Sequence, residues 1–111
     1  MNLPSARILI VDDHPNTALT FARAISQLGP NIDVISANSG KAALAALNEQ
    51  PVDVLITDMM MPDMNGLELI ETLKSRASKD SIYTILITAY DVPGLRESAR
   101  RLKVEIGRAH V

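Results

Sequence analysis

The sequence predicts an α/β fold in which helices cover both faces of a doubly wound parallel sheet. Short apolar runs without strict alternation, such as 8–11 and 83–87, are typical of strands that are buried on both faces. Helix-like stretches separate these runs, and the connecting segments are short. Regular alternation of strands and helices predicts right-handed crossovers, which place the strands parallel to one another.

The first half of the chain predicts a strand, a helix and another strand. Strands are expected near residues 7–11 and 33–37. The helix between them begins at Pro15, because proline is favoured in a first helical turn, and ends before Gly29-Pro30. Its apolar stripe is expected to face the sheet and consists of Ala18, Phe21, Ala22, Ile25 and Leu28.

Three more helices alternate with strands near residues 52–57 and 83–87. The second helix begins after Ser39, a good N-cap residue, the third follows Gly66, and the fourth follows Pro93-Gly94. Their apolar positions are three or four residues apart, at Leu44 and Leu47, at Leu67, Ile70 and Leu73, and at Leu95, Ala99 and Leu102.

Composition narrows the classes of function. A chain of 111 residues with 47% hydrophobic side chains fits one compact domain. It has no cysteine, which excludes disulfides and thiolate chemistry and fits a cytoplasmic protein. A net charge of −2 provides no global positive field for nucleic acid or anionic lipid. No apolar run approaches the ~20 residues of a membrane helix, so no membrane contact is expected.

Oxygen-bearing side chains follow three of the predicted strands. Asp12-Asp13 follows the first strand, Asp58 the third and Thr88 the fourth. In an open parallel sheet, ligands bind beyond the carboxyl ends of the strands. The sequence therefore predicts that these four side chains meet in one shallow crevice.

Three carboxylates in one crevice require a compensating charge. At an effective dielectric near 20, two unit charges about 5 Å apart repel by roughly 3 kcal/mol. Mg²⁺ fits such a site because it prefers hard oxygen ligands. Asp58 stands alone at its strand end and is the candidate nucleophile toward phosphorus, whereas Asp12 and Asp13 form a pair suited to holding the ion. The hydroxyl of Thr88 could donate a hydrogen bond to a phosphoryl oxygen.

The blocks that carry these residues resemble the signature of response-regulator receiver domains. The matching segments are Val11-Asp12-Asp13-His14, the stretch from Thr57 to Gly66, and Ile87-Thr88-Ala89. The resemblance extends from about Arg7 to Val104. It implies a flavodoxin-like sheet of strand order 2-1-3-4-5 and a switch in a two-component phosphorelay.

The resemblance also implies roles for individual residues. Asp58 would accept a phosphoryl group from a partner histidine kinase or phosphotransfer protein. Asp13, Asp58 and the backbone carbonyl of Met60 would bind Mg²⁺, with Asp12 acting through water. Thr88 would be the hydroxyl that moves toward the phosphoryl group when the switch is active.

Two alternatives remain open: a Mg²⁺-dependent phosphatase or phosphotransferase on a similar sheet, and a pseudo-receiver that acts without phosphorylation. Phosphatases that use an aspartyl phosphate place an acid two residues after it, but Met60 occupies that position here and cannot transfer protons. Met60 and Tyr90 are instead expected to shield the acyl phosphate from water. We therefore expect slow self-dephosphorylation rather than enzymatic turnover.

Several other patterns are interpreted as structural. The methionines of the stretch 59–64 are expected to fill the core and loop, and Ser39-Gly40-Lys41 to cap a helix rather than bind a nucleotide. His14 is interpreted as a loop residue without a direct role. The basic edge of the fourth helix is expected to be a solvated face; it comprises Arg96, Arg100, Arg101 and Lys103.

The chain departs from the family after Val104. Family members continue into a fifth strand, a lysine and a final helix, whereas residues 105–111 resemble a translated sequencing adapter. We expect an incomplete receiver domain over 1–104 with an artefactual tail over 105–111, strand order 2-1-3-4, and no fifth strand or last helix. Any output domain would be lost with the missing C-terminus. Neither Lys103, on the fourth helix, nor His110 replaces the lysine. The predicted consequences are an unprotected fourth strand, marginal stability, aggregation and impaired signalling.

Overall fold

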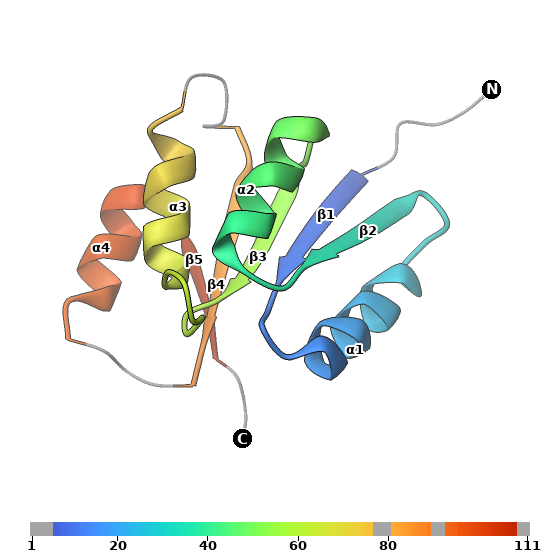
Figure 1. Ribbon diagram of the computed structural model, residues 1–111, viewed down its shortest axis with the longest axis horizontal. Coiled ribbons are helices and arrows are strands. Elements are labelled where there is room, and N and C mark those ends of the chain that lie inside the picture. The colour runs from blue at the N-terminus through green and yellow to red at the C-terminus, as the bar shows by residue number, and fades with distance from the viewer. Residues whose placement is uncertain (1–5, 77–80, 90–92, 109–111) are drawn as a thin grey trace.

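The computed structural model describes residues 6–76, 81–89 and 93–108 and confirms the α/β fold (Figure 1). Five strands form one parallel sheet of order β2-β1-β3-β4-β5. The elements in chain order are β1 (Ala6–Val11), α1 (Pro15–Ser26), β2 (Ile32–Ala37), α2 (Gly40–Glu49), β3 (Val54–Asp58), α3 (Gly66–Lys74), β4 (Tyr83–Thr88), α4 (Leu95–Leu102) and β5 (Glu105–Arg108).

The prediction that the fifth strand is missing was wrong. β5 pairs in parallel with β4, from Ile85 opposite Glu105 to Thr88 opposite Arg108. The strand is only four residues long, but Ile106 packs against the core. The neighbouring strand supplies the hydrogen-bonding edge that so short a segment needs. Consequently β4 is an interior strand, not the unprotected edge that the sequence predicts.

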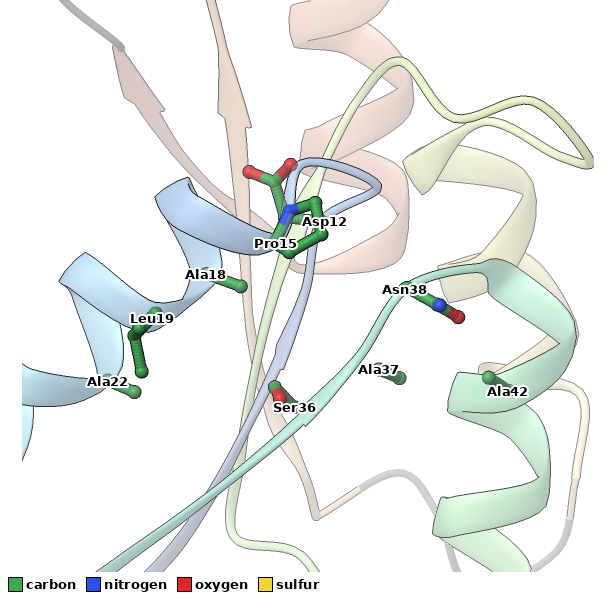
Figure 2. Close-up of a pocket in the computed structure, with 9 residues that line it drawn as sticks. All are labelled: Asp12, Pro15, Ala18, Leu19, Ala22, Ser36, Ala37, Asn38 and Ala42. Atoms are coloured by element: carbon green, nitrogen blue, oxygen red, sulfur yellow. The ribbon is translucent and has the colours of Figure 1, made fainter.

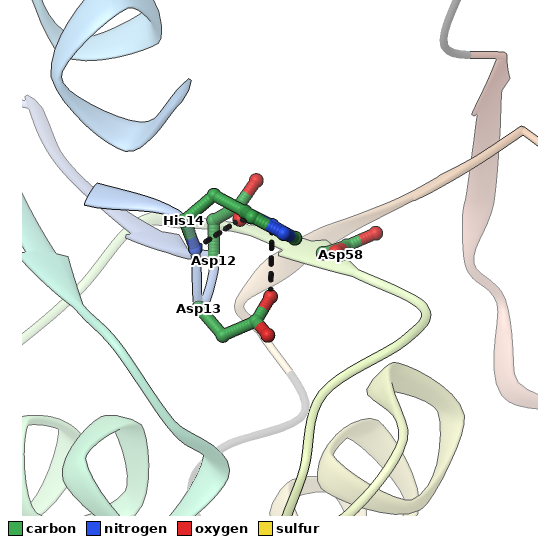
Figure 3. Close-up of side chains that lie close together, drawn as sticks. All are labelled: Asp12, Asp13, His14 and Asp58. Carbon is green, nitrogen blue, oxygen red and sulfur yellow. Dashed lines mark hydrogen bonds and ion pairs between the residues drawn. The ribbon is translucent and has the colours of Figure 1, made fainter. Parts of the chain in front are cut away.

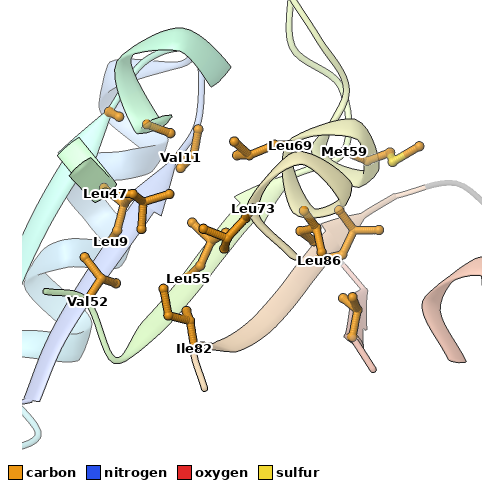
Figure 4. Packing of buried hydrophobic residues seen from close by; sticks show 14 of the residues in the cluster. Leu9, Val11, Leu47, Val52, Leu55, Met59, Leu69, Leu73, Ile82 and Leu86 are labelled. Carbon is orange, nitrogen blue, oxygen red and sulfur yellow. The ribbon is translucent and has the colours of Figure 1, made fainter. Parts of the chain in front are cut away.

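Helices lie on both faces of the sheet, which makes it doubly wound (Figure 1). α2, α3 and α4 pack on one face, where a hydrophobic core cluster lies. In this cluster, buried side chains of the strands pack against buried side chains of the helices (Figure 4). They include Leu9, Leu55 and Leu86 from the sheet, and Leu47, Leu69 and Leu73 from α2 and α3. No helix in the described part of the chain is long and apolar enough to span a membrane.

The face of the sheet that carries α1 is less covered. Ala18 is buried beneath the helix, but Phe21 is 38% exposed and Leu28 is 76% exposed, so only part of the predicted apolar stripe packs inward. The isoleucines of the central strands on this face are only half-buried: Ile56, Ile85 and Ile87. Among the described residues, α1 is the one helix on this side, and it lies against β1 and β2. Apolar surface therefore remains accessible over β3 and β4.

The helix starts follow from local side chains. Ser39 caps α2 as predicted, its hydroxyl accepting a hydrogen bond from the Ala42 N–H at 3.1 Å. Asn65 caps α3 through a reciprocal pair with Glu68, in which each side chain accepts from the other residue's backbone N–H. This capping box fixes where the loop after β3 ends and α3 begins.

Candidate functional site: an acidic cluster at the carboxyl edge of the sheet

Three aspartates meet where two central strands end. Asp12 and Asp13 directly follow β1, and Asp58 is the last residue of β3, the parallel neighbour of β1. One side-chain ligand atom of each aspartate, and one of His14, all lie within 4.8 Å of one another (Figure 3). The structure thus brings together the three carboxylates that the sequence predicts to share a crevice.

The negative charges of the carboxylates in this cluster repel one another. Partial burial raises the pKa of Asp58 most, and the neighbouring negative charges of Asp12 and Asp13 raise it further. Hydrogen bonds from the backbone N–H groups of Met60 and Met59 act in the opposite direction, because they favour the ionised form. An added cation would relieve the repulsion that raises this pKa.

His14 lies against the two aspartates that precede it. Its backbone N–H donates to Asp12 Oδ1 at 2.8 Å, and its ring Nδ1 lies 3.2 Å from the same oxygen. Nδ1 is also 3.0 Å from Asp13 Oδ1, a contact that lacks hydrogen-bond geometry. The hydrogen bond with Asp12 and the charge of Asp13 raise the pKa of His14, although the ring is largely exposed.

The residues present fit a divalent cation. Asp13 Oδ1 is buried and has no hydrogen-bond partner among the residues that the structure describes. A desolvated carboxylate oxygen without a donor is costly, and a coordinated cation would remove that cost. Carboxylate oxygens with room for water and phosphate are the ligands that Mg²⁺ prefers. The carboxylates that could hold the ion are those of Asp12, Asp13 and Asp58.

A tight loop holds Asp58 in place. The N–H of Gly66 donates to the Met59 carbonyl at 2.8 Å, which brings the start of α3 against the end of β3. A Cβ atom at Gly66 would collide with the backbone carbonyl of Asp58 and lie 2.6 Å from Leu86 Cδ1. Only glycine permits this close approach.

The loop is also anchored to α2 by a residue that the sequence did not single out. The Asp63 carboxylate accepts hydrogen bonds from the N–H groups of Gly40 and Lys41, at 3.1 and 2.9 Å. These donors belong to the first turn of α2, where backbone N–H groups have no partner within the helix. No local motif signals the contact, because it joins segments more than twenty residues apart in the sequence.

The remaining predicted residues lie around this cluster. Thr88 is buried at the end of β4, directly after Ile87, which pairs with Asp58. The Met60 side chain is 62% exposed beside the acidic cluster. Tyr90 falls outside the described residues. A groove lined mainly by small side chains of α1, β2 and α2 reaches Asp12 (Figure 2).

Comparison with known proteins agrees with this architecture. The sequence profile of the family described as response regulator receiver domain matches residues 8–105. The chain therefore belongs to the receiver-domain family. It is a receiver domain of the kind found in two-component signalling systems.

Individual relatives place the domain in larger proteins. The chain is 33% identical over 92 residues to a probable cyclic di-GMP phosphodiesterase of Vibrio cholerae, covering 83% of this chain and 20% of the relative. It is 39% identical over 82 residues to the sensor protein EvgS of Escherichia coli K12, covering 74% of this chain and 7% of the relative. The chain thus spans a fifth or less of these two relatives.

One solved structure with this fold was crystallised with a ligand. The response regulator TrrA of Thermotoga maritima, crystallised in complex with Mg²⁺-BeF, superposes with a TM-score of 0.79 at 28% identity. The match covers 94% of this chain and 87% of that one.

Proposed function

We propose that this domain is a phosphoryl-accepting switch whose acceptor is Asp58. The observation that carries the proposal is the convergence of three carboxylates where β1 and β3 end, one of them with a buried oxygen that has no hydrogen bond among the described residues. The donor would be a partner histidine kinase or phosphotransfer protein, consistent with the likeness to the sensor protein EvgS and the response regulator TrrA. Donors of this kind draw phosphate from ATP, which places the proposed reaction in the cytoplasm.

The chemistry is a phosphoryl transfer between side chains. An Asp58 carboxylate oxygen attacks phosphorus, a P–O bond forms, and the P–N bond to the donor imidazole breaks. The released imidazole nitrogen takes up a proton. Bound Mg²⁺ would neutralise charge on the phosphoryl oxygens. Asp12, Asp13, Asp58 and the Met60 carbonyl would hold that ion.

Thr88 is proposed to respond to phosphorylation of Asp58. A phosphoryl group adds about −1.5 to −2 charge and three strong acceptor oxygens. The Thr88 hydroxyl, one residue beyond the strand partner of Asp58, would donate to one of these oxygens. β4 lies between β3 and β5, and α4 packs beside β5. A shift of Thr88 at the end of β4 would therefore favour one packing of β5 and α4 over another.

The covalent state is proposed to be long-lived. Met60 occupies the position where phosphatases of this chemistry carry an acid, and its thioether cannot activate water. The domain would therefore act as a switch with slow self-dephosphorylation and not as a phosphatase.

Beryllofluoride, which mimics a phosphoryl group, provides the test. With Mg²⁺ present, we expect backbone NMR shifts around Asp58 and Thr88, and none in Asp58→Asn. Mg²⁺ titrated alone should shift Asp12 and Asp13. A chain that responds to neither reagent would be a pseudo-receiver, and rapid turnover of a generic phosphate ester would indicate a phosphatase; either result would overturn the proposal.

A further inference from the structure

We propose that the His14 imidazole is a direct nitrogen ligand of the divalent ion held by the acidic cluster. As such a ligand, it would shift the metal preference of the site from Mg²⁺ toward Mn²⁺ and Co²⁺. This inference rests on the proposed function, which requires a cation beside Asp58, but it adds a ligand and a selectivity.

The distances around His14 match those between neighbouring metal ligands. An octahedral ion with ligands at about 2.1 Å separates adjacent ligand atoms by about 3.0 Å. Nδ1 of His14 lies 3.0 Å from Asp13 Oδ1 and 3.2 Å from Asp12 Oδ1. Nδ1 therefore lies at the spacing expected of a ligand adjacent to these two carboxylate oxygens (Figure 3).

The contact between His14 and Asp13 lacks the geometry of a hydrogen bond. Asp13 Oδ1 is buried, and although Nδ1 is its close neighbour, the geometry leaves the oxygen without a hydrogen bond among the described residues. A carboxylate oxygen and a neutral imidazole nitrogen can approach this closely when both coordinate one cation. The pair thus points to a third partner.

Among the described residues, the contacts of the His14 ring are those with Asp12 and Asp13. His14 occupies the N-cap of α1, but its side chain makes no capping hydrogen bond. Its side chain is 70% exposed, so packing does not hold the ring. The backbone hydrogen bond from His14 N–H to Asp12 Oδ1, at 2.8 Å, holds the residue where its ring can face the carboxylates.

The ligand atoms determine which metal ions bind more tightly. Carboxylate, carbonyl and water oxygens suit Mg²⁺ and Mn²⁺, whereas an imidazole nitrogen favours borderline transition metals such as Co²⁺. Mn²⁺ accepts both ligand types and precedes Co²⁺ in the affinity order. A site of three carboxylates and one imidazole should therefore bind Co²⁺ and Mn²⁺ more tightly than an all-oxygen site, with little gain for Mg²⁺.

The most direct test detects nitrogen bound to the metal. Electron spin-echo spectroscopy of the full chain with Mn²⁺ should show coupling to a directly bound imidazole nitrogen. The chain has only two histidines, so His110→Ala is a matched control. We expect the coupling in the wild type and in His110→Ala, and its loss in His14→Ala. Bound Mn²⁺ without nitrogen coupling, or coupling lost in His110→Ala instead, would overturn the inference.

Metal affinities supply a second readout and separate the two proposals. We expect His14→Ala to weaken Co²⁺ binding about ten-fold, a typical loss for a metal-site contact, while changing Mg²⁺ binding little. His14→Asn, which offers an amide oxygen, should keep Mg²⁺ affinity without restoring Co²⁺ affinity. If the ratio of Co²⁺ to Mg²⁺ affinity is unchanged in His14→Ala, His14 is not a metal ligand, and the proposed function is unaffected. Failure of Asp13→Asn and Asp58→Asn to weaken Mg²⁺ binding would refute the metal site itself.

Discussion

The carboxylate of Asp63, in the loop after β3, accepts a hydrogen bond from the backbone N–H of Lys41 at the start of α2, at 2.9 Å. A second hydrogen bond, from Gly40, makes the link two-pronged. The loop that begins at the phosphoacceptor candidate is thereby fixed to a helix on the covered face of the sheet.

The Asp63 link predicts a pH-dependent contribution to stability. Hydrogen bonds from Lys41 and Gly40 lower the pKa of Asp63 below its ordinary value of 3.8. A carboxyl group with a lowered folded-state pKa stabilises the fold above its unfolded pKa and loses that contribution as the pH falls through the folded value. Asp63→Asn should therefore lower the urea midpoint near neutral pH, and its difference from the wild type should shrink in acid.

An exposed aspartate provides the control for this measurement. Asp33 forms a surface ion pair with Arg7 at 2.8 Å, and exposed pairs contribute little. Asp33→Asn should leave the urea midpoint almost unchanged. A stability loss in Asp63→Asn that persists undiminished in acid would show that the carboxylate charge is not the cause.

Gly66 should tolerate no side chain. A Cβ there would collide with the Asp58 carbonyl and press on Leu86, so Gly66→Ala should cost about 2 kcal/mol of unfolding free energy, as overpacking does. Gly66→Ala should also impair phosphorylation, because the end of β3, which carries Asp58, must move to make room for the new methyl group. Gly29→Ala is the matched control, since nothing lies within 4 Å of its Cβ position. Equal stability of the two variants in urea would contradict the close-approach argument.

Met60 should set the lifetime of the phosphorylated state. Its exposed side chain is two residues beyond Asp58 and has no acid or base, so Met60→Asn should speed phosphate loss after labelling with acetyl phosphate. Met60→Leu keeps the bulk and should keep the slow rate. Tyr90→Ala should act like Met60→Asn. If neither Met60→Asn nor Tyr90→Ala changes the decay, shielding is not what preserves the acyl phosphate.

On the face of the sheet that carries α1, apolar surface over β3 and β4 is accessible. A polypeptide of these 111 residues should therefore self-associate. Half-buried isoleucines of β3 and β4 lie on this face, and Phe21 on α1 is 38% exposed. Phe21→Ser should raise the monomer fraction in sedimentation velocity, with little loss of secondary structure. A sharp, reversible thermal transition of a wild-type monomer would contradict this expectation.

Much of the fold could be predicted because its signals are local. Buried parallel strands are nearly continuous apolar runs, and Ser39, Gly66 and the Pro93-Gly94 pair mark helix starts within a few residues of their positions in the structure. The convergence of Asp12, Asp13 and Asp58 follows from strand order alone, because neighbouring parallel strands end at one edge.

The features that were missed depend on contacts distant in sequence. The segment Glu105–Arg108 has one bulky apolar residue, Ile106, and becomes a strand because β4 offers it an edge. Asp63 looks like an ordinary loop residue until α2 is placed beside it. Phe21 follows a helical stripe in the sequence, yet α1 lies over β1 and β2 and leaves that ring partly exposed.

The central claim is that Asp58 carries the phosphoryl group, and locating the acyl phosphate tests it most directly. The chain would be labelled with acetyl phosphate and Mg²⁺, reduced with borohydride to convert the acyl phosphate to homoserine, and mapped by peptide mass spectrometry. The account predicts homoserine at position 58 only, and no labelling without Mg²⁺. Homoserine at position 12 or 13, or labelling that persists in Asp58→Asn, would contradict it.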